Sequence, residues 1–146
     1  MTPNIELRYL ILAAQRTGAR IMTTVLKPLD LTPAQAEVLN VLSRFEPVSL
    51  ARLGELLVCE TGSPSRLASG LVLRTISNAD GRVVRLSLSV TGRALIGPIQ
   101  ALDDEIAARI GARLTPEETR AVIEGLRKLL AEAPPGQAVE RRRVLT

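Results

Sequence analysis

The chain has 146 residues, 46% of them apolar, which is typical of one domain with a sizeable core. Its net charge of +4 and its pI near 10.2 favour polyanionic partners, although Arg141, Arg142 and Arg143 supply part of the positive excess. The longest apolar run, from Tyr9 to Ala14, is too short to cross a bilayer, and the first residues lack the pattern of a signal peptide. We therefore expect a soluble, cytoplasmic protein without a membrane partner.

The first segment, from about Ile5 to Leu26, has apolar residues at helical spacing on several sides of the predicted helix. Lys27-Pro28 ends it, because a proline displaces the preceding residue from the α region. Tyr9 and Phe45 are the only aromatic residues, and the mean hydropathy is +0.18. This composition indicates aliphatic faces that one domain does not bury alone, and a homodimer would cover them.

Three helix starts then follow in the order of a helix-turn-helix. Thr32 to Gln35 combines an N-cap, a proline at the first helical position and a capping-box glutamine, which predicts a helix that ends near Phe45. Ser49 suits the N-cap of a short leucine-rich helix, and Ser63-Pro64 suits the start of a third helix with a polar outer face. Gly70 is expected to mark the end of that third helix.

Two strands are predicted next, from Val72 to Ile76 and from Val83 to Leu88. The second strand alternates apolar and polar side chains, and the loop between the strands contains Asp80-Gly81, a pair that favours positive φ. We expect one face of this hairpin to pack against the rest of the protein and the other to be exposed to solvent. A basic ribbon after three helices is the arrangement of a winged helix-turn-helix that reads DNA.

Two further helices are predicted towards the end of the chain. Thr91 is expected to cap a long helix from Gly92 towards Ala112, whose apolar stripe suits pairing with another long helix and which Pro98 is expected to kink. Thr115 to Glu118 forms a second capping box, with proline at the first helical position of a last helix. Pro134-Pro135-Gly136 is expected to stop this helix, and the remainder has the polar composition of a flexible tail.

Together these elements predict a mainly α fold with a small β-wing, a winged helix-turn-helix with N- and C-terminal dimerisation helices. We expect four parts along the chain: an N-terminal dimerisation helix (1–30), a winged helix-turn-helix DNA-binding lobe (31–90), C-terminal dimerisation helices (91–133) and a flexible basic tail (134–146).

Four stretches carry a resemblance to a known family: LTPAQAEVLNVL (31–42), PVSLARLGELL (47–57), GSPSRLASGLV (62–72) and DGRVVRLSLSVTGRAL (80–95). In this order they resemble the multiple antibiotic resistance regulator (MarR) family of bacterial transcription factors, and the resemblance extends from Ile5 to Ala131. It implies a triangular homodimer that binds double-stranded DNA. It also implies, for many members, a small aromatic or phenolic acid as ligand.

Two features depart from the family pattern. Between Ser69 and Leu73 the chain is shorter by roughly a turn and a half of helix, so we expect a shortened recognition helix. Gly81 stands where the family often has an arginine ahead of the arginine kept here as Arg82, so one wing charge is absent and a lower DNA affinity is expected.

The hydroxyl and guanidinium groups of the third helix, the strands and the wing are the candidate DNA contacts. The residues alone favour Arg66 as a solvated arginine or as a partner of Glu60, whereas the resemblance to the family favours a bidentate contact with guanine. Arg82, at the wing tip, is the candidate for minor-groove insertion. The candidate DNA-binding residues are Ser49, Ser63, Ser65, Arg66, Ser69, Arg74, Arg82 and Arg85.

Several of these residues have an alternative interpretation. Ser49 can present its backbone N–H to a phosphate or serve only as an N-cap. Arg74 and Arg85 are either phosphate contacts or ordinary surface residues. Asp80 is expected to fix the wing tip, by pairing with Arg82 or by capping the turn, instead of contacting DNA.

The sequence has few of the residues and motifs that form catalytic, metal or redox sites. It has no histidine, Gly-rich phosphate loop or metal-ligand spacing, so we expect no enzyme activity, no metal and no cofactor. Cys59, the single cysteine, excludes an internal disulfide and lies near the helix-turn-helix turn, where a small buried side chain is the expected role. Arg16 or Arg20 can bind a ligand carboxylate or belong to a solvated helix face, so the ligand-binding residues stay unknown.

Two hypotheses for function follow. The first is a dimeric repressor of a pseudo-palindromic operator, released by a small phenolic or aromatic ligand if one exists. The second is a structural or protein-binding dimer with the same frame that has lost sequence-specific DNA reading, which the shortened helix and depleted wing would favour.

Overall fold

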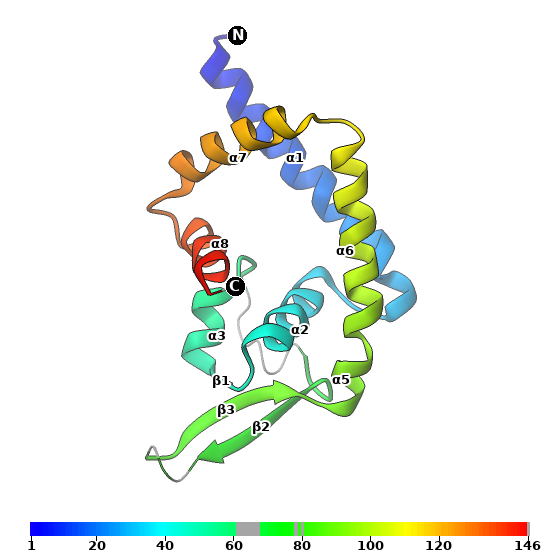
Figure 1. The fold of residues 1–146 in the computed structure, drawn as a ribbon, viewed down its shortest axis with the longest axis vertical. Coiled ribbons are helices and arrows are strands. Elements are labelled where there is room, and N and C mark those ends of the chain that lie inside the picture. Colours follow the sequence, from blue (N-terminus) through cyan, green and yellow to red (C-terminus); the bar gives the residue numbers. More distant parts are fainter. Residues whose placement is uncertain (61–67, 78, 80, 146) are drawn as a thin grey trace.

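A computed structural model of the chain describes residues 1–60, 68–77, 79 and 81–145. It is mainly helical with a small three-stranded sheet at one end, which confirms the predicted fold class (Figure 1). The elements in chain order are α1 (Pro3–Leu26), the 3₁₀ helix η1 (Lys27–Leu29), α2 (Pro33–Phe45), β1 (Val48–Ser49), α3 (Leu50–Leu56), β2 (Val72–Ser77), β3 (Val83–Leu88), α5 (Val90–Ala94), α6 (Ile96–Gly111), α7 (Pro116–Leu130) and α8 (Pro134–Val144).

Helix α2 is the centre of the core. The expected capping box is present at its start, because Thr32 Oγ1 accepts from the Gln35 backbone N–H at 3.2 Å and Gln35 Oε1 accepts from the Thr32 N–H at 2.9 Å. Its apolar side is buried against α3, β3 and α6, as the heptad-like spacing predicts. The buried residues of α2 are Ala36, Val38, Leu39, Val41 and Leu42.

The sheet has the order β1-β3-β2 and is antiparallel throughout. β2 and β3 have nearly the predicted bounds. β1 was not predicted, because it has only two residues and its place is set by pairing of Val48 with Leu86 and of Ser49 with Arg85 in β3. Leu86 and Leu88 are buried, so the inner half of one face packs on the lobe as expected.

The long helix predicted from Gly92 differs in two ways. Its N-cap is Ser89, whose Oγ accepts from the Gly92 N–H at 3.0 Å, and not Thr91, so the helix begins at Val90. It also breaks at Leu95 into α5 and α6. The break has a local cause, because Pro98 has no N–H to donate to the carbonyl of Ala94 four residues earlier.

Helix α7 begins at the predicted capping box, where Thr115 and Glu118 exchange hydrogen bonds of 2.8 and 3.2 Å. The prediction of a flexible tail at 134–146 is wrong for residues 134–144, which form α8. Pro134 occupies the first helical position, where its missing N–H is not needed, and Ala138 is buried to 1% exposure. The polar composition did not indicate this helix, because two of its arginines, Arg141 and Arg142, contact the lobe.

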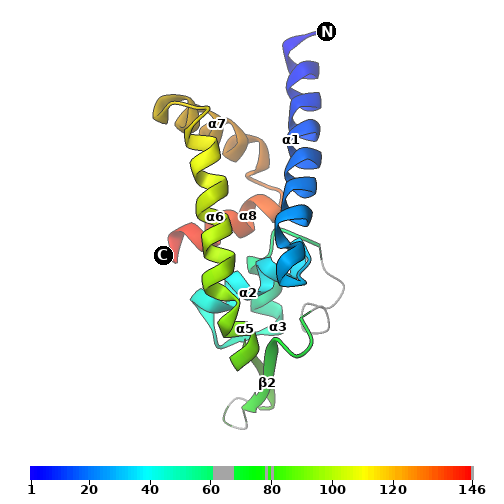
Figure 2. The same ribbon diagram turned by 90° about the vertical axis from the view of Figure 1, so that its right-hand side faces the viewer.

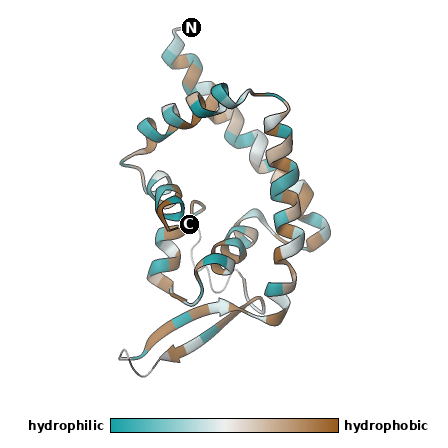
Figure 3. Ribbon diagram, in the orientation of Figure 1, coloured by the Kyte–Doolittle hydropathy of each residue, from teal (hydrophilic) through white to brown (hydrophobic). Residues whose placement is uncertain are grey.

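Helices α1, α6 and α7 leave the lobe and expose much of their apolar surface. Every residue from 1 to 20 is exposed, and α1 and α6 rise from the lobe as separate columns (Figure 2). Brown segments along these helices mark their hydrophobic residues (Figure 3). In the described ranges, no helix combines the length and hydropathy needed to cross a membrane. The exposed apolar residues of α1, α6 and α7 include Ile5, Leu7, Tyr9, Leu10, Ile11, Leu12, Ile110, Val122, Ile123, Leu129 and Leu130.

Gly92 of α5 packs closely against the backbone of Leu71, just before β2. We expect Gly92→Ala to destabilise the fold. A Cβ at this position would lie 2.2 Å from the Leu71 carbonyl oxygen, which itself accepts a hydrogen bond from the Ser89 N–H. Relieving this overlap moves backbone, so we expect a loss of about 1–3 kcal/mol in the free energy of unfolding.

Gly97→Ala is the matched control for this substitution, because a Cβ there meets no atom within 4 Å. It should leave stability unchanged or raise it by up to roughly 1 kcal/mol, the difference in helix propensity. Denaturant titration of both variants measures the effect, and equal midpoints would contradict the close approach at Gly92.

Candidate nucleic-acid interface

The ribbon of β2 and β3 extends beyond the helices of the lobe, with its turn at the outer edge of the molecule (Figure 1). Gly81 and Arg82 both have φ of +68° in this turn. Arg82 is exposed and directly follows Gly81, so the chain presents a guanidinium at the end of the wing. This place fits the minor-groove role proposed for Arg82 from the sequence. Asp80 lies outside the described residues.

The two strand arginines do not lie on the same face of the wing. Arg74 is opposite Leu86, so it shares the face on which Leu86 and Leu88 pack against the lobe. Arg85 is opposite Thr75 and Ser49, on the other face. Arg74 is exposed and Arg85 is half-buried. A DNA backbone lying along one face of the ribbon would therefore meet one of these guanidiniums and not both.

Ser49 links the sheet to the start of α3. Its Oγ accepts from the Arg52 N–H at 3.1 Å, which makes it the N-cap that the sequence predicts. Its hydroxyl is therefore occupied in the structure by the helix start. The phosphate contact proposed for its backbone N–H stays a prediction.

The third helix of the predicted motif falls mostly outside the described residues, and so do its candidates Ser63, Ser65 and Arg66. Residues 68–70 form a turn in which Ser69 is exposed and Gly70 has φ of +79°, a conformation that favours glycine. Its predicted place at the end of the third helix stays a prediction. Ser89 fixes this turn to α5, since its Oγ donates to the Gly70 carbonyl at 2.9 Å.

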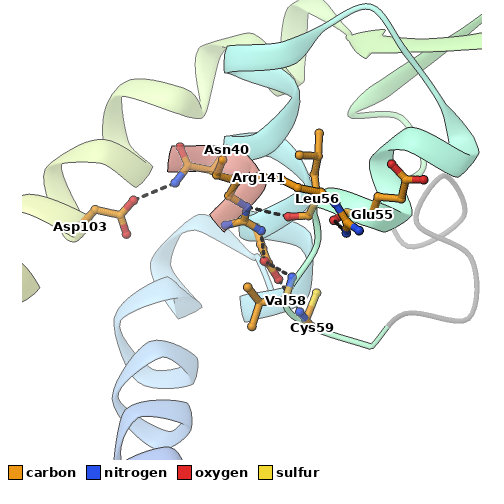
Figure 4. Close-up of polar contacts among 9 residues, drawn as sticks. Asn40, Glu55, Leu56, Val58, Cys59, Asp103 and Arg141 are labelled. Carbon is orange, nitrogen blue, oxygen red and sulfur yellow. Dashed lines mark hydrogen bonds and ion pairs between the residues drawn. The ribbon is translucent and has the colours of Figure 1, made fainter. Parts of the chain in front are cut away.

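Glu37, which the sequence analysis did not single out, organises the chain after α3. Its carboxylate accepts from the backbone N–H groups of Val58 at 2.7 Å and Cys59 at 2.9 Å, and it pairs with Arg142 of α8 (Figure 4). Burial alone would raise the pKa of Glu37, but these hydrogen bonds and that of the Cys59 thiol outweigh it and hold the pKa below its usual 4.5. The only sequence signal is a carboxylate between the buried positions 36 and 38.

Two more polar contacts tie α2 to the helices that follow the wing. Glu46 accepts from the Leu88 backbone N–H at 2.6 Å and pairs with Arg93 of α5 at 2.5 Å. Asn40 Nδ2 donates to Asp103 Oδ2 of α6 at 2.8 Å (Figure 4). Asp103 is exposed, and its bond to Asn40 holds the lobe against α6.

Cys59 packs at the edge of the core and hydrogen-bonds to Glu37. Burial, and then the hydrogen bond to the Glu37 carboxylate, raise the pKa of the thiol to about 12. The thiol therefore stays protonated at neutral pH, which fits the structural role expected for it.

Two observations on the described part of the chain concern metal and ligand binding. Within residues 1–60, 68–77, 79 and 81–145, His, Cys, Asp and Glu side chains do not gather in a group of three that would hold a metal ion. A shallow hollow on α1 is lined by Ala19, Arg20, Thr23 and Thr24, which places Arg20 beside an open surface.

No family model matches the chain, but a curated protein and several solved structures are similar to it. The chain is 30% identical over 132 residues to the HTH-type transcriptional regulator TtmR of Methylorubrum extorquens, covering 87% of this chain and 67% of that protein. It is similar to a MarR-family transcriptional regulator from Silicibacter pomeroyi, with 26% identity, a TM-score of 0.70, and 87% and 89% of the two chains covered. It is also similar to a mutant MarR from E. coli complexed with operator DNA, with 26% identity, a TM-score of 0.75, and 86% and 94% covered.

We expect Cys59 to react slowly with thiol reagents in the folded protein. Its raised pKa leaves very little thiolate near neutral pH, so alkylation by iodoacetamide should be at least about tenfold slower than that of a free cysteine peptide. The same protein in denaturant provides the control and should react at the peptide's rate. A folded-state rate equal to the peptide's would show that the hydrogen bond to Glu37 does not hold the thiol proton.

Proposed function

The chain belongs to the MarR family of transcriptional regulators, which are not enzymes, and from this premise we propose that it acts as a homodimeric repressor of a pseudo-palindromic operator. As a member of the family it is a DNA-binding transcription regulator. The wing carries the proposal, since it places Arg82 at the outer end of a ribbon beside the helix-turn-helix lobe.

The proposed homodimer follows from the exposed apolar surface of α1, α6 and α7. Leu10 and Leu12 of α1 are 58% and 43% exposed, and Leu129 and Leu130 of α7 are 60% and 42% exposed. Leaving such aliphatic helix faces in water is unfavourable at about 25 cal/mol per Å², so a second copy that covers them is stabilising. Two lobes related by a two-fold axis then read two half-sites, which accounts for an operator with pseudo-palindromic symmetry.

Titration of the purified protein against promoter DNA of its own and neighbouring genes tests the proposal. We expect binding to one fragment at least about 10³-fold tighter than to scrambled DNA, as specific regulators show. A footprint with two half-sites about one helical turn apart would support the dimer arrangement. Salt-sensitive binding without sequence preference would instead favour the second hypothesis, a dimer of the same fold that has lost sequence-specific DNA recognition.

We also propose a small aromatic or phenolic acid as the ligand that releases the operator. Arg20 beside the hollow on α1 supplies a guanidinium for the carboxylate, and the neighbouring Ala19 supplies apolar surface. A regulator of similar fold, 22% identical to this chain, is an organohalide sensor solved with 2,4-dichlorophenol bound. Addition of benzoate and salicylate to the operator titration tests this, and an unchanged operator affinity at all ligand concentrations would speak against an aromatic acid.

Arg82→Ala is expected to weaken operator binding and to flatten its dependence on salt. Removing one cation from the interface releases one counterion fewer, so the slope of log affinity against log salt should fall by about one. Arg113→Ala is the matched control, because it removes the same charge at an exposed site between α6 and α7. The wing role would be refuted if both variants kept the slope of the unsubstituted protein.

A further inference from the structure

The C-terminal helix α8 returns to the helix-turn-helix lobe and packs against α3 (Figure 1). Arg141 Nη1 donates to the Glu55 carbonyl at 3.0 Å, and Arg142 Nε donates to the Leu56 carbonyl at 2.6 Å. Arg142 also pairs with Glu37 of α2. Three hydrogen-bonded contacts thus join the end of the chain to the lobe across 86 or more residues of sequence.

These contacts meet a local need of α3. The helix has only seven residues, and no basic side chain of its own stands in its last turn. Its last carbonyls have no partner within the helix, and its C-terminal end carries partial negative charge. The guanidiniums of Arg141 and Arg142 provide both donors and positive charge there, so α8 supplies the C-terminal cap that the sequence of α3 lacks.

The pair between Arg142 and Glu37 extends this cap to the chain that leaves α3. Glu37 is 17% exposed and Arg142 25% exposed, so water screens their pairing only in part. The same carboxylate holds the N–H groups of Val58 and Cys59, at the start of the connection to the predicted recognition segment. Arg142 therefore holds in place the carboxylate that sets the backbone direction there.

The lobe is also held from its other side. Asn40 of α2 bonds to Asp103 of α6, and Glu46, which directly follows α2, pairs with Arg93 of α5. Helix α2 is thus connected both to the beginning of the C-terminal helical arm, through α5 and α6, and to its end, through α8. A lobe held at both ends of this arm keeps one orientation relative to it.

We propose that Arg142 is a positioning residue for DNA reading, and that α8 is a strap that fixes the helix-turn-helix relative to the α6–α7 arm. This inference rests on the proposed function, because it concerns how the lobe meets its half-site. Arg142 contacts no DNA in this role. It acts through Glu37 and the end of α3.

Arg142→Ala tests the strap against a matched control. Arg143→Ala removes the same charge from the same helix, where Arg143 is 60% exposed and pairs with Glu140 of α8 itself. We expect Arg142→Ala to weaken binding to the operator fragment by about tenfold or more while binding to scrambled DNA changes no more than in Arg143→Ala. A general loss of folded protein would lower both affinities together, so the ratio of the two affinities separates positioning from stability.

Arg142→Lys keeps the charge but provides one point of attachment in place of a planar fork, so its operator affinity should lie between those of Arg142→Ala and the unsubstituted protein. It also serves if Arg142→Ala does not fold. Equal operator-to-scrambled ratios in the Arg142 and Arg143 variants would overturn the proposal.

Hydrogen exchange provides a readout that needs no DNA. Loss of Arg142 should speed amide exchange in residues 50–60, where α3 and the Glu37-bonded N–H groups lie, by at least about tenfold, and should leave α6 unchanged. If the unsubstituted protein shows no operator preference, the proposed function fails. The strap is then judged by this exchange alone, and exchange equal to that of Arg143→Ala would overturn it as well.

Discussion

The burial of helix α2 is the constraint on which the other elements depend. Val38, Leu39 and Leu42 are fully buried, and α3, β3 and α6 all pack around them. Because the apolar side of α2 is fixed in the core, the directions of the polar side chains on its other faces are fixed as well. Glu37 meets α8 and Asn40 meets α6 there, and Glu46, directly after the last residue of α2, pairs with Arg93 of α5. One amphipathic helix thus sets both the core and the polar contacts that hold the lobe in its frame.

Local signals in the sequence were enough to predict most helix starts and the wing. Thr32 and Thr115 are followed by proline and by a glutamine or glutamate at the third helical position, and both form the expected capping boxes. The strands of the wing were predicted because alternating side chains and an Asp-Gly turn act over a few residues. The predicted N-cap at Thr91 was wrong, because Ser89 caps the helix and its hydroxyl also reaches the Gly70 carbonyl, a contact that only the fold creates.

The features that sequence reasoning missed depend on partners far along the chain. β1 exists because Val48 lies opposite Leu86, and α8 is ordered because Ala138, Arg141 and Arg142 meet the lobe. The Pro-Pro-Gly start of this segment has weak helix propensity and the residues after it are largely polar, so its composition alone indicates a flexible tail. Among the candidate DNA contacts, the wing tip could be placed by turn chemistry, whereas the opposite faces of Arg74 and Arg85 follow from strand register.

The backbone conformation of the wing turn explains why glycine suits position 81. With φ of +68° and open space around it, this position is limited by backbone conformation and not by room for a side chain. A non-glycine residue in the left-handed region costs about 1 kcal/mol, and Arg82 already adopts that region. Two successive side chains there would double the strain. A glycine at position 81 therefore limits the strain of this turn to one side chain, that of Arg82, so the wing tip carries a single arginine.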